Sequence, residues 1–254
     1  MKYQDILPAQ FSTIGEEIKE KGFAFRSGKE IGAAMKDLGV DLDGHQFASS
    51  WDDLGLDLCM ADGGRYRRRR FAAFRLLDNF ISRKPHQPHY QSQDYNTLNG
   101  GIQRCFDPVL EEVANHSFMQ ELIGICGRVF DRISPDPARS SPWHTEVHQF
   151  RIETRNKESG LPTPEGMHRD GVDWVCVALI NRENVTSGVT KILDTENGSL
   201  SQFILTHRLD AVFLDDRRVL HGVTPISFAN PEHHGFRDVL VLTFRHDADK
   251  ALAQ

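Results

Sequence analysis

The hydrophobic and polar positions divide the chain into two regions with different periodicities. Apolar residues recur at intervals of three and four in segments 9–20, 28–38, 44–54 and Asp107 to Ile133. This spacing predicts amphipathic helices, because it places apolar side chains along one stripe of a helix surface. Gly124 and Gly127 are expected weak points of the last helix. Between these segments, Lys84 to Gly101 is so rich in His, Gln, Asn, Pro and Gly that we expect an unpacked polar loop.

From Trp143 onward the pattern changes to short β-type runs separated by turn residues. The runs are HTEVHQFRIET, VDWVCVALI, GVTKILD, LSQFILTH, DAVFLDD and DVLVLTF. No helix-length segment lies between them, so right-handed parallel crossovers are excluded and an antiparallel sandwich or jelly-roll barrel is predicted. Trp174 to Ile180 is apolar on both faces. We expect that strand to be covered by the barrel core on one side and by the N-terminal helices on the other.

The predicted fold is mainly β with flanking helices, an α+β arrangement around a jelly-roll, cupin-like core. We expect one domain over residues 1–254, in which 1–135 supply helical support and the first strands and 143–246 form the β-barrel core with the site.

Composition narrows the function classes without pointing to one. Charged residues make up 26% and hydrophobic residues 39% of the chain, and the net charge is -6. These values favour a folded protein without a broad nucleic-acid or anionic-membrane surface. No apolar run of about 18 residues predicts a membrane span, and the N-terminal residues do not resemble a secretory signal. Four scattered cysteines without a CxxC pair are typical of reduced thiols in a cytoplasmic protein; the oligomeric state stays open, with a homodimer as one option.

Candidate metal ligands lie in the C-terminal region. His168 and Asp170 are separated by one residue, so on an extended segment both side chains leave the same face. His221, just after the DAVFLDD strand, could supply a third ligand. Two histidines and one carboxylate leave the opposite side of a metal open, as non-haem Fe(II) requires for a co-substrate and dioxygen. An HxD pair alone is weak evidence, since such pairs are more often solvated.

Arg237 begins the strongly apolar strand RDVLVLTF. A guanidinium directed into an apolar pocket needs an anionic partner, and the far carboxylate of a dicarboxylate is a suitable one. An ion pair with Asp238 is the alternative.

Several of these strings together resemble a known family. PEGMHRDGVDWVCVALINREN, DAVFLDDRRVLHGVTPI and GFRDVLVLTF, with DGGRYRRRRFAAF nearer the N-terminus, are similar to the bacterial 2-oxoglutarate/Fe(II) dioxygenases that include L-isoleucine 4-hydroxylase and related hydroxylases of free L-amino acids. The resemblance implies a double-stranded β-helix in which His168, Asp170 and His221 bind Fe(II) and act as the catalytic centre. It implies that Arg237 binds the distal carboxylate of 2-oxoglutarate. The implied reaction consumes 2-oxoglutarate and O2, forms succinate and CO2, and hydroxylates an unactivated C–H bond.

The residues that select the substrate are less clearly marked. An amino acid needs partners for both its carboxylate and its ammonium group. Gln149 and Arg151, two apart on one strand, and Asp173, just after the HxD motif, are candidates for substrate binding, and Thr224 is a candidate for binding 2-oxoglutarate. In the arginine run, alternation along a strand would direct Arg67 and Arg69 to one face and Arg68 and Arg70 to the other.

Two other functions are weighed against the hydroxylase. A cupin-like metal enzyme could use the same ligands without 2-oxoglutarate. A binding module could bind RNA or an acidic protein through the cluster Arg65 to Arg70. The sequence leaves the role of this cluster undecided. Which amino acid or derivative is the substrate, and which of its atoms is oxidised, cannot be derived because the pocket depends on loops such as Lys84 to Gly101 and Asn156 to Met167. We expect a small-molecule substrate and no nucleic-acid or membrane partner.

Overall fold

The structure is a computed structural model that describes residues 7–40, 42, 45–78, 80–134, 142–154 and 158–247. Its helical elements are η1 (Ala9–Phe11), α1 (Ile14–Lys21), α2 (Gly28–Asp37), α3 (His45–Ser49), α4 (Glu111–Ala114) and α5 (Ser117–Ile133). Its strands are β1 (Phe23–Arg26), β2 (Arg67–Leu77), β3 (Phe80–Arg83), β4 (His89–Tyr90), β5 (Gln103–Arg104), β6 (Trp143–Thr154), β7 (Trp174–Glu183), β8 (Val185–Ser187), β9 (Thr190–Asp194), β10 (Leu200–Phe203), β11 (Ala211–Asp215), β12 (Val219–Val223), β13 (Ile226–Phe228) and β14 (Gly235–His246). The described helices all precede Trp143, strands β1 to β5 lie among them, and β6 to β14 follow.

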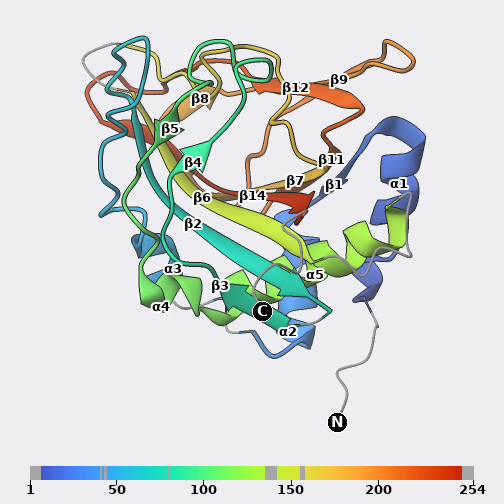
Figure 1. The fold of residues 1–254 in the computed structure, drawn as a ribbon. Helices are drawn as coiled ribbons and strands as arrows, with labels where there is room; N and C mark the ends of the chain where they lie inside the picture. Colours follow the sequence, from blue (N-terminus) through green and yellow to red (C-terminus); the bar gives the residue numbers. More distant parts are fainter. Residues whose placement is uncertain are drawn as a thin grey trace.

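A large antiparallel sheet forms the centre of the fold. Its strand order is β1-β11-β7-β14-β6-β2-β3, with β14 paired along its full length to β6. The smaller sheet β10-β9-β12 and the pair β13-β8 lie across from it (Figure 1). Two facing antiparallel sheets without helical crossovers make the jelly roll that the short β-type runs predicted, so the expected fold class is confirmed.

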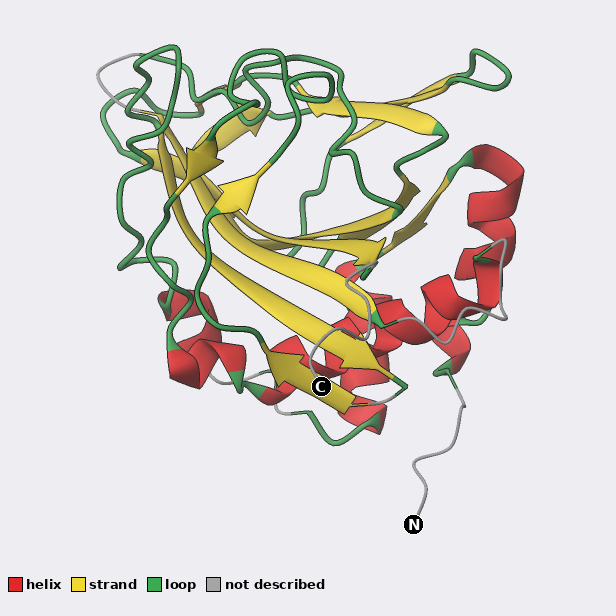
Figure 2. Ribbon diagram, viewed as in Figure 1, coloured by secondary structure: helices red, strands yellow, loops and turns green. Residues whose placement is uncertain are grey.

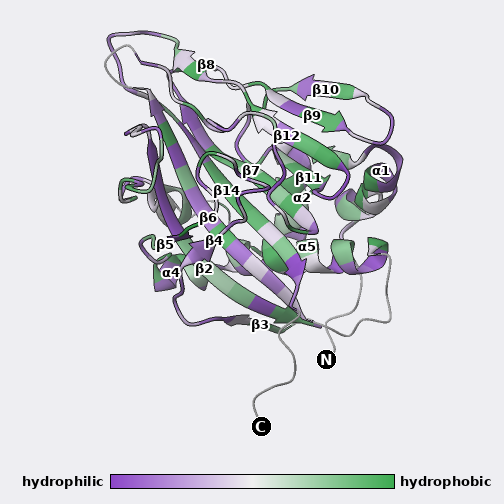
Figure 3. Ribbon diagram, turned by 45° about the horizontal axis from the view of Figure 1, so that its top comes forward, coloured by the Kyte–Doolittle hydropathy of each residue, from purple (hydrophilic) through white to green (hydrophobic). Residues whose placement is uncertain are grey.

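The helices cover the outer face of the large sheet (Figure 2). Phe130 of α5 stacks on Trp174 of β7 with ring centroids 5.3 Å apart, and it meets Phe244 of β14 edge-on at 5.1 Å. Trp174 is thus a core residue on the helical side of the sheet, away from the small sheet. Because the largest hydrophobic cluster lies between helices and sheet, the inner face of the sheet can carry polar residues, which interrupt the apolar ones along the central strands (Figure 3).

The single helix predicted from Asp107 to Ile133 is wrong in one respect, since α4 and α5 are separate. His116 caps α5, and its ring nitrogen accepts a hydrogen bond from a backbone N–H of the first turn. Gly124 and Gly127 do not interrupt α5. A Cβ on Gly127 would lie 2.2 Å from Leu76 of β2, so this glycine allows the helix to pack closely on the sheet.

The expectation that Lys84 to Gly101 does not pack is also wrong. This segment contains β4, and its residues Gln91, Asn96 and Asn99 are 8%, 5% and 2% exposed. β4 pairs with β5, which places His89 directly opposite Arg104. The segment therefore folds over the inner face of the large sheet as a covering layer rather than as a solvated loop.

Two expectations drawn from composition can be compared with the structure. Among the described residues, no helix has both the length and the apolar character needed to cross a membrane. All four cysteines are free thiols. Cys126 and Cys176 are buried, Cys59 is half-buried and Cys105 is exposed.

Candidate metal centre and active-site pocket

His168 and His221 face each other across the rim of the small sheet. They form an antiparallel bridge in which each backbone N–H donates to the other residue's carbonyl, both at 2.9 Å. Directly opposed residues of an antiparallel pair project to the same face, and the two imidazole centroids are 4.6 Å apart. The Asp170 carboxylate reaches both rings: its Oδ1 is 3.5 Å from His168 Nε2 and its Oδ2 is 3.5 Å from His221 Nε2. One ligand atom from each residue thus lies within 4.8 Å of the other two.

The turn that carries Asp170 is held by a second, buried carboxylate. Asp216, which is 1% exposed, accepts hydrogen bonds from the backbone N–H groups of Asp170, Gly171 and Val172 at 2.9, 2.8 and 3.0 Å. Gly171 has φ 82°, a left-handed conformation that favours glycine, and Tyr95 packs against it. Asp216 therefore fixes the backbone from which a metal ligand projects, a role that the sequence did not reveal.

Hydrogen bonding sets the imidazole nitrogen that would bind a metal. His168 Nδ1 lies 3.0 Å from the Gly166 carbonyl, which can only accept, so in the neutral ring Nδ1 carries the hydrogen and Nε2 keeps its lone pair. Burial lowers the pKa of His168, but the hydrogen bond and charge of Asp170 outweigh it and raise that pKa to about 9. Asp170 is half-buried; burial raises its pKa, but hydrogen bonds from His168 and His221 hold that pKa well below the usual range. These three groups attract positive charge and suit a divalent metal.

A second cluster with the same composition lies in the same pocket. His89, Glu146 and His148 also bring three ligand atoms within 4.8 Å of one another. However, Arg69 Nη2 is 2.6 Å from His148 Nδ1, and a guanidinium only donates. His148 Nδ1 must therefore accept, so the hydrogen of the neutral ring is on Nε2, which faces Glu146 at 3.6 Å. A protonated nitrogen cannot coordinate a metal. We therefore interpret this cluster as a carboxylate, that of Glu146, which accepts hydrogen bonds from histidine rings.

Further contacts around Glu146 agree with this interpretation. Lys84 Nζ is 2.8 Å from His144 Nδ1, which leaves His144 Nε2 to donate to Glu146 at 3.3 Å. His89 Nδ1 donates to the same carboxylate at 3.0 Å. Glu146 is half-buried; burial raises its pKa, but these imidazole N–H groups hold that pKa well below the usual range. Burial and the charge of Arg69 lower the pKa of His148 to about 3, so both partners keep the charge states that the hydrogen bonds require.

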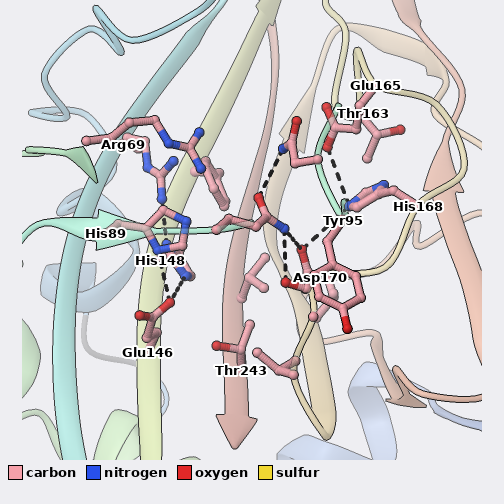
Figure 4. Close-up of a pocket in the computed structure, with 18 of the residues that line it drawn as sticks. Arg69, His89, Tyr95, Glu146, His148, Thr163, Glu165, His168, Asp170 and Thr243 are labelled. Carbon is pink, nitrogen blue, oxygen red and sulfur yellow. Dashed lines mark hydrogen bonds and ion pairs between the residues drawn. The ribbon is translucent and has the colours of Figure 1, made fainter. Parts of the chain in front are cut away.

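The two clusters line one cavity of about 560 Å³. Figure 4 shows His168, Asp170 and Glu165 on one side of it and Arg69, His89, Glu146 and His148 on the other. Gln91, from the covering segment, donates to the Asp170 carboxylate at 3.3 Å and to its carbonyl at 3.1 Å. The volume is in the range of small-molecule sites.

Arg237 enters the cavity from β14 and has no anionic partner in the part of the chain that the structure describes. The residue is 2% exposed, and its Nε and Nη2 have no hydrogen-bond acceptor among those residues. Asp238, the alternative partner, instead binds Arg151 through two contacts of 2.7 Å. Burial and the charge of Arg182 lower the pKa of Arg237 to about 10. A buried guanidinium without a partner is costly, so the site suits the carboxylate of a bound molecule.

The structure does not bring the residues predicted for substrate binding to the cavity. Gln149 and Arg151 lie on the opposite face of β6, where Gln149 donates to Ser50 Oγ at 2.9 Å and Arg151 pairs with Asp238. Asp173 Oδ2 accepts from the backbone N–H of His246 at 3.0 Å, outside the cavity.

Thr224, predicted for 2-oxoglutarate binding, shapes a turn, because its Oγ1 accepts from the backbone N–H of Val189 at 2.8 Å. It does not line the cavity.

The arginine run follows the predicted alternation. Arg67 and Arg69 line the cavity, whereas Arg68 pairs with Glu153 and Arg70 binds Asp53. Arg67, Arg69 and Arg70 are 6%, 4% and 8% exposed, so these arginines do not form a surface that could track a phosphate backbone.

The pocket residues on β6 were not predicted, although the sequence carries a signal for them. His144, Glu146 and His148 alternate along β6, as the string HTEVH shows, and a period of two places them on one face. His89 lies in the segment that was expected to be an unpacked polar loop, but it is buried against Glu146.

Comparisons with known proteins agree with this geometry. The sequence model of the family described as 2OG-Fe dioxygenase matches residues 48–243. An L-isoleucine-4-hydroxylase of Bacillus thuringiensis is 23% identical over 162 residues, 64% of this chain and 67% of that protein. A 3(1)-hydroxy-L-isoleucine 4-dioxygenase of Pantoea ananatis is 23% identical over 168 residues, 64% of this chain and 66% of that protein. The matched regions therefore span about two thirds of each relative.

Solved structures show the same fold. A BsmA homologue from Methylobium petroleophilum has a TM-score of 0.84 and 32% identity, with all of both chains covered. The structure described as IDO from Bacillus thuringiensis has a TM-score of 0.75 at 17% identity, covering 93% of this chain and 99% of that one.

Proposed function

The chain belongs to the 2OG-Fe dioxygenase family, and on this premise we propose that it hydroxylates a small substrate resembling a free L-amino acid. Enzymes of this family use Fe(II), 2-oxoglutarate and O2. The observation that carries the proposal is that His168, Asp170 and His221 present three ligand atoms to the same cavity as Arg237, whose Nε and Nη2 have no acceptor in the described part of the chain. The names of the relatives support the amino-acid substrate, since two of them act on isoleucine or its hydroxylated derivative.

The residues present fit the metal and the co-substrate. His168 and His221 would hold Fe(II) through Nε2 and Asp170 through a carboxylate oxygen, with the Gly166 carbonyl orienting the first ring. Arg237 would bind the distal carboxylate of 2-oxoglutarate. When bound, iron and 2-oxoglutarate supply the oxidising power: one O2 is consumed, one oxygen atom enters the substrate as a hydroxyl and the other enters succinate as CO2 is released.

The chain's own task is to position the substrate and exclude water. Val177, Val239 and Val241 line the cavity from β7 and β14 and give it an apolar floor. The covering segment closes over the metal ligands, and Gln91 fixes the orientation of Asp170. A dry, fixed geometry favours reaction at the C–H bond held nearest the metal over side reactions with solvent.

The iron site is tested by spectroscopy under anaerobic conditions. Fe(II) with 2-oxoglutarate should give the weak visible charge-transfer band of the chelate, and His168→Ala or Asp170→Ala should abolish it. His233→Ala changes an exposed histidine and should keep the band. A wild-type protein that binds neither metal nor 2-oxoglutarate would show that the proposed function is wrong.

Arg237→Gln separates this function from that of a cupin-like enzyme that does not use 2-oxoglutarate. Loss of two charge-assisted hydrogen bonds, each worth about 1.5–3 kcal/mol, should raise the KM for 2-oxoglutarate by at least about 100-fold. Activity that needs no 2-oxoglutarate and survives this substitution would favour the cupin-like alternative.

A further inference from the structure

Arg104 is a second buried guanidinium in the cavity that has no anionic partner among the described residues. It follows the covering segment on β5, is 3% exposed and lines the same cavity as the metal ligands. Its Nε has no hydrogen-bond acceptor, and its side chain forms no ion pair with any residue that the structure describes. Because 2-oxoglutarate has only one distal carboxylate, for which Arg237 is available, Arg104 calls for a different anion.

Arg69 lies beside Arg104, and its guanidinium also has a hydrogen-bond donor without an acceptor. Its guanidinium carbon lies 3.6 Å from the ring centroid of Phe106 and 4.5 Å from that of Phe150, so the group is held between two aromatic faces. Arg104 approaches the same Phe106 ring at 5.8 Å. The Nε of Arg69 has no acceptor among the described residues. The two guanidiniums thus share one aromatic neighbour, and each has an Nε–H group without an acceptor among the described residues.

The acids in this part of the cavity are engaged by groups other than Arg104. Arg67 and Arg69 share one carboxylate, Asp57, at 2.7 and 3.9 Å. Burial and the charge of Arg67 lower the pKa of both Arg69 and Arg104. Besides Asp170, two acids line the cavity: Glu146 already accepts hydrogen bonds from imidazoles, and Glu165 lies 3.4 Å from His168 Nε2. The charge of Glu165 acts on Arg104, but no carboxylate of the described residues forms an ion pair with that guanidinium, so a bound anion would offset the cost of its burial.

We propose that Arg104 and Arg69 bind the carboxylate of the substrate. This inference rests on the proposed function and adds the group by which the substrate is recognised. Strand order and register separate the site from that of 2-oxoglutarate. Ile152 of β6 lies opposite both Arg237 of β14 and Arg67 of β2, so Arg237 and the β2 arginines stand two strand spacings, roughly 10 Å, apart. The substrate is therefore a carboxylic acid held at the β2–β5 side while its side chain extends toward the metal ligands.

A comparison of acids with their neutral carboxamides tests the inference. Succinate formation is measured with Fe(II) and 2-oxoglutarate against rising concentrations of L-isoleucine, L-leucine and L-methionine, and of the corresponding amino-acid amides. For the wild-type enzyme we expect at least one acid to have a KM about 50-fold or more below that of its amide, because only the acid offers two oxygens to the guanidiniums.

Arg104→Gln should remove this discrimination. The KM for the acid should rise about 30- to 100-fold toward that of the amide, while the KM for 2-oxoglutarate changes less than about twofold; Arg104→Lys should restore part of the preference. Arg68→Gln is the matched control, because Arg68 neighbours Arg69 on β2 but pairs with Glu153 on the other face. The inference would be overturned if Arg104→Gln still preferred the acid over its amide as strongly as the wild type does, or if only the KM for 2-oxoglutarate rose.

A stability measurement separates binding from a structural role. Without ligands, Arg104→Met replaces an unpartnered buried charge by an apolar side chain and should raise the Tm, whereas Arg68→Met breaks an ion pair and should lower it. A lower Tm for Arg104→Met would show that Arg104 serves the fold, and the inference fails. A wild-type enzyme that forms the iron chelate but does not prefer any acid over its amide also overturns the inference, while the proposed function stands; absence of the chelate refutes the function itself.

Discussion

Asp216 offers the sharpest test of how the metal ligands are held in place. Its Oδ2 accepts the backbone N–H groups of Gly171 and Val172, and its Oδ1 accepts that of Asp170. Asp216→Asn keeps the shape of the side chain but replaces one oxygen by an NH2 group, so at least one backbone N–H faces another donor. Hydrogen bonds to a charged acceptor contribute about 1.5–3 kcal/mol each. Loss of one or two of them should lower the free energy of unfolding by about 2–5 kcal/mol.

The same substitution should weaken Fe(II) binding by about 10- to 100-fold, the range typical for residues that orient metal ligands. Urea unfolding of the metal-free protein and Fe(II) titration measure the two effects separately. Asp215→Asn is the matched control, because Asp215 is adjacent but its carboxylate accepts from Arg217 near the surface rather than from the ligand turn. If Asp216→Asn keeps wild-type stability and iron affinity, Asp216 does not organise the ligand turn and this account of the site is refuted.

The strands after Trp143 could be predicted because each is a short run of local pattern, and no long-range information is needed to see it. By contrast, β1, β2 and β3 come earlier in the chain, among the helical segments, and yet they join the large sheet. The end of one helix was missed because it depends on a single cap, the ring nitrogen of His116. The burial of Gln91 could not be seen either. Its partner Asp170 is distant in the chain, so a polar side chain that is satisfied inside the protein looks like one that is solvated.

The residues of the site could likewise be predicted where the signal is local in sequence, but not where it depends on strand pairing. His168 and Asp170 are close in sequence, and a strand period of two was enough to place them together. β6 shows why the substrate residues were misplaced. Both of its faces carry polar side chains, and the period identifies two sets without showing which set faces the cavity. The pairing of β6 with β2 and β14 decides this: Glu146 and its histidine neighbours point inward, while Gln149 and Arg151 point toward the helices.

Two further predictions follow from single contacts. Gly171→Ala should destabilise the protein more than Gly198→Ala: both glycines have left-handed φ angles, but only at Gly171 would the added Cβ lie 2.4 Å from Tyr95. Equal losses of unfolding free energy in urea would argue against close packing at the ligand turn. His148 should make stability sensitive to acid, because its folded pKa of about 3 lies below its unfolded value of about 6.5. Between these values the unfolded chain binds the additional proton, so stability falls as the pH falls, by about 1.4 kcal/mol per pH unit. The groups facing His148 include Arg69, Glu146 and His89. His148→Gln can accept from Arg69 and donate to Glu146 as the neutral ring does, yet it cannot be protonated in this range. Urea unfolding at pH 4.5, 5.5 and 7 should therefore show a shallower pH dependence for His148→Gln, and a slope equal to that of the wild type would mean that His148 is not held neutral.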